Sequence, residues 1–267
     1  MTKTHQLKTD ALKAGYGEKA ILREVNLTIA PGKITSIVGA NACGKSTLLR
    51  TLSRLLSPME GQVLLDGHSI HHMATRSLAQ TLGLMPQSPI APEGITVGDL
   101  VSRGRHPHQG LMSRWRREDE DAVAHALAMT QTAKLVEREV DQLSGGQRQR
   151  VWIAMALAQQ TEILLLDEPT TFLDVAHQVE VLDLLVDLNQ QRGTTIVMVL
   201  HDLNLAARYS DELVALKNGE VYAHGHPSDV LNRSLIQDVF GLENQIIQDP
   251  VSNMPMMIPI GRHRQAG

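Results

Sequence analysis

A glycine-rich loop at residues 39–47 constrains the fold of this chain more than any other segment. It reads Gly-Ala-Asn-Ala-Cys-Gly-Lys-Ser-Thr and fits the pattern G-x-x-x-x-G-K-[ST]. The apolar run Ile34–Val38 precedes it, and apolar residues at helical spacing follow it from Lys45 to Leu56. Such a loop between a strand and a helix binds phosphate groups through backbone N–H groups. The segment therefore predicts a nucleotide-binding α/β core.

Each part of this loop has an expected role. Lys45 supplies a positive charge to the phosphates, and the Ser46 hydroxyl is a ligand for Mg²⁺. Cys43 is either a reactive thiol at a helix N-terminus or a small residue that fills space, and the second interpretation is favoured. The residues predicted to contact the nucleotide here are Gly39, Ala40, Asn41, Ala42, Cys43, Gly44, Lys45, Ser46 and Thr47.

A pair of acids follows a second apolar run. Ile163–Leu166 is expected to be a buried parallel strand, and Asp167 and Glu168 come directly after it. Side chains at the carboxyl end of such a strand face the ligand crevice of an α/β sheet. Asp167 is therefore predicted to hold Mg²⁺, directly or through water, and Glu168 to polarise the attacking water as a general base. The alternative is a strand end that simply reaches solvent.

A third motif, Leu-Ser-Gly-Gly-Gln-Arg-Gln, occupies residues 143–149 and precedes a long helical run. Ser144 is a favourable N-cap, and glycines let the backbone approach an anion closely. An ordinary capped helix would explain the pattern equally well when it is taken alone. The phosphate-binding interpretation assigns the contact to Ser144, Gly145, Gly146 and Gln147.

The remaining pattern predicts an α/β fold, with a P-loop NTPase core made of a mostly parallel sheet and flanking helices. Strands before residue 35 and around 62–65 are expected to form an N-terminal antiparallel β layer. Residues 88–160 are expected to be an inserted, mainly helical sub-domain, within a single domain over 1–267. Residues 254–260 are expected to form a buried terminal strand.

Composition excludes several classes of function. The net charge is −4 and aromatic residues make up 3% of the chain, so a nucleic-acid partner is not expected. One cysteine allows no disulfide within the chain, which fits a reducing compartment. No run of about 18 apolar residues is present. If the chain serves a membrane process, a partner must supply the membrane span.

The three motifs in this order resemble the ABC transporter ATPases over essentially the whole chain. The resemblance implies that two copies enclose two ATP molecules head to tail, with the 143–149 motif binding the γ-phosphate of the ATP held by the other copy. Tyr16 matches the aromatic residue that stacks on adenine, and Gln87 matches the residue that senses Mg²⁺ and the attacking water. Asp174 matches the loop that contacts the opposite subunit, and His201 matches the switch histidine on the γ-phosphate. Taken singly, each of these four could be an ordinary surface, linker or helix-start residue.

One position departs from the family pattern. ABC ATPases usually carry glycine where this chain has Ala42. If that position needs a positive φ, alanine costs about 1 kcal/mol. Nucleotide binding is expected to survive this cost.

Segments 101–110, 148–155 and 167–174 resemble the importers of ferric siderophores and related iron chelates. This implies an ATP-hydrolysing subunit, a translocase, at the cytoplasmic face of the bacterial cytoplasmic membrane. Transmembrane permease subunits would hold it there, with segment 99–117 docking the permease, and a periplasmic or extracellular siderophore-binding protein would take part indirectly. A haem or vitamin B12 importer is an alternative cargo assignment. A soluble, non-transport ABC ATPase and a P-loop small-molecule kinase are the alternatives from other classes.

Overall fold

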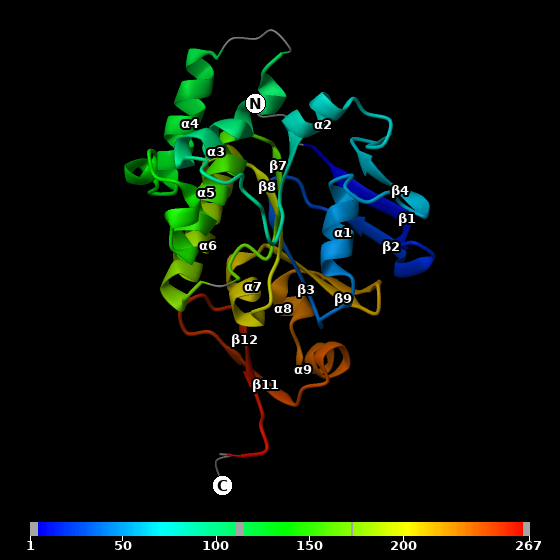
Figure 1. Cartoon of the computed structure of the whole chain (residues 1–267). Helices are drawn as coiled ribbons and strands as arrows, with labels where there is room; N and C mark the ends of the chain where they lie inside the picture. Colours follow the sequence, from blue (N-terminus) through cyan, green and yellow to red (C-terminus); the bar gives the residue numbers. More distant parts are fainter. Residues whose placement is uncertain (1–4, 111–114, 172, 264–267) are drawn as a thin grey trace. The chain divides into compact units, whose positions relative to one another are not determined.

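The computed structural model describes residues 5–110, 115–171 and 173–263. It divides into two compact units. The middle unit is His72–Ile196, and the terminal unit combines His5–His71 with the segment from Val197 onward. Each unit has its own strands and helices, and Figure 1 labels most of them in chain order.

The terminal unit contains the antiparallel layer that the sequence predicts. Its four strands lie in the order β2-β1-β4-β5, and β1 pairs antiparallel with both β2 and β4. Strand β1 is not evident from the sequence, because its pairing is interrupted by register shifts and its buried residues alternate irregularly. The strands of this layer are β1 (Leu7–Tyr16), β2 (Lys19–Thr28), β4 (Glu60–Leu65) and β5 (His68–Ser69).

Parallel pairing in the terminal unit joins β3 (Ile34–Gly39) to β9 (Glu212–Lys217). All six residues of β3 are buried, as expected for a strand covered on both faces. Helix α1 (Lys45–Leu52) follows the glycine loop and ends four residues before the predicted end at Leu56. The other elements here are α7 (Leu203–Tyr209), β10 (Glu220–Gly225), α8 (Pro227–Val230), α9 (Arg233–Leu235), the π-helical turn Ile236–Phe240, β11 (Asn244–Gln248) and β12 (Pro255–Pro259).

The C-terminal hairpin is β11 paired antiparallel with β12. The prediction of a strand at residues 254–260 is confirmed, but its predicted burial is wrong. The residues of β12 are half-buried or exposed, because the strand belongs to a two-stranded sheet.

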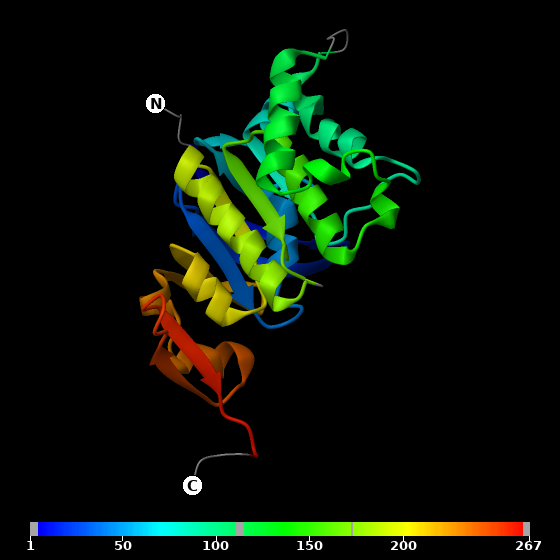
Figure 2. The same cartoon turned by 90° about the vertical axis from the view of Figure 1, so that its left-hand side faces the viewer.

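The middle unit holds the parallel pair β6 (Leu82–Met85) and β7 (Ile163–Asp167) together with most of the helices. Helices α3, α4 and α5 pack against one another, as two perpendicular views show (Figure 1 and Figure 2). The mainly helical character predicted for this region is confirmed, while its status as a separate sub-domain stays a prediction. The elements are α2 (Thr75–Thr81), α3 (Val97–Ser102), α4 (Arg117–Met129), α5 (Gly145–Ala158), α6 (Val175–Arg192) and three 3₁₀ turns, Arg103–His108, Ala133–Leu135 and Val140–Gln142.

A buried ion pair holds part of this helical packing together. Arg105 Nε donates to Asp119 Oδ1 at 2.8 Å, and Arg105 Nη1 donates to the Ala158 carbonyl at 2.8 Å. Arg105 and Asp119 are each 4% exposed. Burial alone would raise the pKa of Asp119, but the hydrogen bond and charge of Arg105, with the Arg116 N–H, hold that pKa below its usual value. The pair therefore joins the 103–108 turn, α4 and the end of α5.

Strand β8 (Thr195–Val199) has its first two residues in the middle unit and its last three in the terminal unit. All five are buried. Among the residues that the structure describes, no helix has both the length and the apolar character needed to cross a membrane.

Candidate functional site

Two glycines give the 39–47 loop its shape. Gly39 has φ 153°, and a Cβ there would lie 2.4 Å from the Leu216 carbonyl oxygen. Gly44 has φ 111°, and a Cβ there would lie 2.8 Å from Leu22 Cδ2. At Gly39 both the backbone conformation and the nearby backbone exclude a side chain, and at Gly44 the backbone conformation disfavours one.

Ala42 adopts the left-handed conformation with φ 61°. In this conformation alanine is less stable than glycine, so the expected energetic cost applies here.

Lys45, at the start of α1, is 6% exposed. Its Nζ donates to the carbonyls of Gly39 at 2.8 Å and Ala40 at 3.0 Å. The lysine charge thus lies inside the curve of the loop, where a phosphate group is expected to bind.

Cys43 is buried between these residues. Burial raises the pKa of its thiol, against the smaller opposing effects of the Lys45 charge and the backbone N–H groups of the loop. A thiol with a raised pKa is a poor nucleophile at neutral pH. Its environment therefore favours the space-filling role over the reactive one.

Two further predicted residues of the terminal unit lie on its surface. The Tyr16 ring, at the end of β1, is 48% exposed, and its hydroxyl accepts a hydrogen bond from Arg50 Nη1 at 3.1 Å. Its exposed ring suits the predicted stacking on adenine. His201 is exposed and follows β8, between Leu200, whose N–H donates to Ile37, and the first turn of α7.

The middle unit brings Gln87 and Glu168 into direct contact. Gln87 Nε2 donates to Glu168 Oε2 at 2.6 Å, and Thr171 Oγ1 donates to the same oxygen at 3.0 Å. Glu168 is 7% exposed and has φ 55°, a conformation that costs energy for a residue with a side chain. Its carboxylate is therefore held in one orientation by two donors and by its backbone.

Asp167 ends strand β7 and is 3% exposed. A carboxylate here, the hydroxyl of Ser46 and the amide oxygen of Gln87 are all hard oxygen donors, which are the ligands that Mg²⁺ takes in proteins. The donor types present therefore fit the predicted ion.

The 143–149 motif begins helix α5 with reciprocal capping bonds. Ser144 Oγ accepts from the Gln147 N–H at 3.3 Å, and Gln147 Oε1 accepts from the Ser144 N–H at 3.3 Å. Ser144 and Gly145 are exposed, and nothing lies within 4 Å of a Cβ built on Gly145. The start of α5 therefore presents bare backbone to its surroundings, as a phosphate-binding helix end requires.

The start of α6 lies against this motif. Asp174 caps α6 through the His177 N–H at 3.0 Å, and its Oδ1 is 2.7 Å from His177 Nδ1. These two hydrogen bonds, with the charge of His177, lower the pKa of Asp174. A Cβ built on Gly146 would lie 3.5 Å from His177 Cδ2, so the imidazole packs beside the glycine backbone. Nearby, Gln149 Nε2 donates to the Pro169 carbonyl at 2.8 Å.

The predicted residues thus fall into two groups, one in each unit. Residues 16, 39–47 and 201 lie in the terminal unit, and residues 87, 144–147, 167, 168 and 174 lie in the middle unit. Thr171, His177 and Gln149 were missed from the sequence. The position of Thr171, three residues after Glu168, is the signal that could have identified it.

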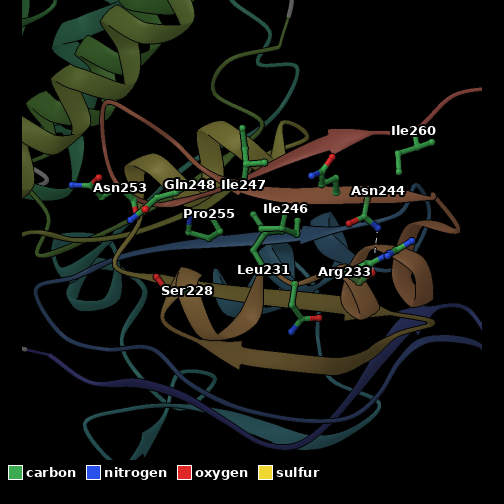
Figure 3. A pocket seen from close by; sticks show the side chains of 12 residues that line it. Ser228, Leu231, Arg233, Asn244, Ile246, Ile247, Gln248, Asn253, Pro255 and Ile260 are labelled. Atoms are coloured by element: carbon green, nitrogen blue, oxygen red, sulfur yellow. Dashed lines mark hydrogen bonds between the residues drawn. The ribbon is translucent and has the colours of Figure 1, made fainter. Parts of the chain in front are cut away.

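A separate hollow of about 810 Å³ lies between the C-terminal hairpin and the α8–α9 region (Figure 3). Its lining includes Arg233, Asn244 and Ile246, all within the terminal unit. None of the residues predicted to bind nucleotide lines it.

Comparisons with known proteins agree with the three motifs. A family model described as "ABC transporter" matches residues 22–171. The chain is 53% identical over 258 residues to the "Probable siderophore transport system ATP-binding protein YusV" of Bacillus subtilis (strain 168), an alignment that covers 97% of this chain and 94% of that protein. It is 49% identical over 257 residues to the "Ferric enterobactin transport ATP-binding protein FepC" of Escherichia coli (strain K12), with 96% and 95% covered.

Among solved structures, the chain resembles an inward-facing ABC transporter described as being of the metal-chelate type. The TM-score is 0.82 at 29% identity, with 97% of this chain and 98% of that chain covered. Fold, motif order and sequence identity over nearly the whole length agree. The chain therefore belongs to the ABC transporter family.

Proposed function

We propose that this chain is the ATP-hydrolysing subunit of an importer of ferric siderophores. The observation that carries the proposal is the near full-length identity of 53% and 49% to two proteins named for siderophore and ferric enterobactin transport. In this proposal the chain works at the cytoplasmic face of the bacterial cytoplasmic membrane. Transmembrane permease subunits hold it there, and a siderophore-binding protein on the other side delivers the cargo to them.

ATP binding begins in the terminal unit. The loop 39–47 surrounds the phosphates with N–H groups, and Lys45 exchanges its bonds to the Gly39 and Ala40 carbonyls for phosphate oxygens. The exposed ring of Tyr16 stacks on the adenine. Mg²⁺, held by Ser46, Asp167 and Gln87, would supply charge neutralisation at the phosphates.

Hydrolysis uses Glu168 as the general base. Its carboxylate accepts a proton from the attacking water, and Gln87 and Thr171 hold that carboxylate in place. His201 contacts the γ-phosphate and thereby couples the presence of this phosphate to the position of α7. The energy for closing two copies comes from ATP contacts that are made only in the closed pair.

The exposed start of α5 is the part of one copy that closes over ATP held by its partner. Gly145 and Gly146 present backbone N–H groups to the γ-phosphate beside the Ser144 hydroxyl, and Asp174 faces the opposite copy. This head-to-tail arrangement makes each nucleotide site incomplete in a single chain. Hydrolysis then removes the shared phosphate, and the pair opens.

The permease docks on segment 99–117 in this proposal. Arg105 cannot take part as a surface charge, because it is buried against Asp119. Arg103, Trp115 and Arg116 are exposed and remain available. Of the basic run at residues 114–117, Arg114 lies outside the described residues.

Uptake by the complete complex tests the proposal. The chain is co-purified with its permease, reconstituted in vesicles and supplied with ATP and radiolabelled ferric enterobactin, a ferric hydroxamate, haem or vitamin B12. ATP-dependent uptake of a ferric siderophore, absent with Glu168→Gln, supports the proposal. Uptake of haem or vitamin B12 alone would move the cargo assignment to those importers. Phosphate transfer to a metabolite without release of free phosphate would indicate a kinase instead.

A further inference from the structure

The side chain of Asn204 joins the C-terminal hairpin to helix α7. Asn204 Nδ2 donates to the Met257 carbonyl at 3.1 Å, and Asn204 Oδ1 accepts from the Met257 N–H at 2.7 Å. One amide group thus satisfies both backbone groups of a single residue in β12. A neighbouring strand would make the same two bonds.

Met257 lies at the outer edge of the hairpin. It is opposite Ile246 in the antiparallel register, and its N–H and carbonyl both point to Asn204. Since both backbone groups of a strand residue point to the same side, this edge of β12 faces α7 rather than β11. Helix α7 and β12 lie side by side in both views (Figure 1 and Figure 2).

Strand β11, the other strand of the hairpin, borders a hollow. The hollow of about 810 Å³ lies under β11, where Asn244 Nδ2 reaches the Arg233 carbonyl at 3.2 Å (Figure 3). A two-stranded hairpin has little stability by itself. The attachment to α7 at Asn204 is therefore important for the position of the hairpin and, reciprocally, for the position of the helix.

The helix held in this way begins at Leu203, two residues after His201. Asp202 Oδ1 caps α7 by accepting from the N–H groups of Asn204 at 2.8 Å and Leu205 at 2.9 Å. Asn204 is thus bonded through its backbone to the cap and through its side chain to the hairpin. On the other side of His201, the Leu200 N–H donates to the Ile37 carbonyl in β3 at 3.3 Å. A shift of α7 would therefore move the backbone on one side of His201 relative to the other.

We infer that Asn204 is a positioning residue for ATP hydrolysis, and that the hairpin β11–β12 holds the switch histidine in place through it. This inference rests on the role proposed above for His201. The hairpin and α7 restrain each other at Asn204, and α7 in turn keeps His201 oriented toward the γ-phosphate. Binding of ATP to the 39–47 loop does not depend on this connection.

The test measures kcat and KM for ATP in the reconstituted complex with its permease. Asn204→Ala is expected to lower kcat between about tenfold and a hundredfold, because a small misplacement of a catalytic group has effects of that size. KM for ATP is expected to stay within about twofold. Gln248→Ala is the matched control, since that amide lies in the hairpin and bonds Asn253 rather than α7. It is expected to keep the wild-type kcat.

A second set of variants separates this inference from the proposed function. In a His201→Ala background, Asn204→Ala is expected to cause no further loss, because both changes act on one group. An equal loss in both backgrounds, or wild-type kcat for Asn204→Ala, would overturn the inference. If His201→Ala itself hydrolyses ATP normally, the proposed role of His201 fails, and with it the inference.

Met257→Pro examines the same bond from the hairpin side. It removes the N–H that Asn204 Oδ1 accepts, at an edge position where proline is tolerated. The same fall in kcat is expected, with no additional fall in the double variant with Asn204→Ala. This variant also decides the question if Asn204→Ala fails to fold. Wild-type kcat for Met257→Pro would then overturn the inference.

Discussion

Gln87 Nε2 donates a hydrogen bond of 2.6 Å to Glu168 Oε2, which joins a residue just after strand β6 to the carboxylate just after strand β7. The two strands are parallel neighbours, so their carboxyl ends lie at the same edge. The bond restrains the residue expected to activate water.

Glu168→Gln is expected to keep ATP binding and to lower hydrolysis roughly 10²–10⁴-fold, because the general base is lost. The phosphate contacts remain, so a closed pair of copies should accumulate with ATP. Phosphate release and size-exclusion chromatography measure the two effects. Glu137→Gln, at an exposed position, is the control. Turnover at the wild-type rate would show that Glu168 is not the base.

Lys45→Ala is expected to weaken ATP binding at least about tenfold, because a buried charge directed at the phosphates is removed. Equilibrium binding of a fluorescent ATP analogue measures the change. Lys19→Ala, on the exposed end of β2, provides a comparison with the same loss of charge. Equal affinities for the two variants would contradict the role given to Lys45.

Ser144→Arg is expected to spare ATP binding by the single chain and to prevent closure of the pair, because a long cation would cover the exposed helix start. Ser144→Ala serves as the matched variant. It removes only the cap, at a cost of about 1 kcal/mol, and should still close. Analytical ultracentrifugation with ATP in the Glu168→Gln background distinguishes them. Closure by both variants would exclude the two-copy nucleotide site.

Asp119→Asn is expected to lower the free energy of unfolding by about 3–5 kcal/mol near pH 7, because it leaves Arg105 buried without its counter-charge. The folded-state pKa of Asp119 lies below its unfolded value of 3.8. The stabilisation is therefore present above that value and is lost as the pH falls through the folded-state pKa. Urea unfolding at about pH 7 and about pH 3 measures the difference. Asp121→Asn, exposed on the same helix, is the control and should keep the free energy of unfolding close to the wild-type value near pH 7.

Ala42→Gly is expected to stabilise the folded chain by up to about 1 kcal/mol, since glycine adopts φ 61° without the cost that alanine bears. The opposite sign is expected for Ala154→Gly in the interior of α5, where glycine is unfavourable. Denaturant unfolding compares the two. If the free energy of unfolding falls by the same amount in both variants, the backbone at residue 42 is not strained.

Strands β3 and β7 could be placed from the sequence because each is a short apolar run that leads directly into a motif. Their predicted and observed bounds differ by one residue at the end. The end of α1 could not be placed, because the leucine spacing continues past Leu52. In the structure Arg54 has φ 63° and Leu55 is 68% exposed, so apolar spacing there does not signify a helix.

Contacts between distant residues could not be predicted from local patterns. The Asn204–Met257 bonds span 53 positions, and His177 lies beside Gly146 only because α5 and α6 are adjacent. Polar side chains of this kind have no periodic signal. The glycine loop, the acid pair and the 143–149 motif were recognisable because their chemistry requires fixed residue types at fixed spacing.

Cys43 is the single cysteine of the chain; its thiol is buried, and this burial raises the pKa of the thiol. A maleimide dye should leave it unmodified under native conditions. A cysteine introduced at an exposed position could then be labelled without first removing the native one. Fluorophores attached in this way to two copies would report opening and closing directly, in the chain with its natural phosphate loop.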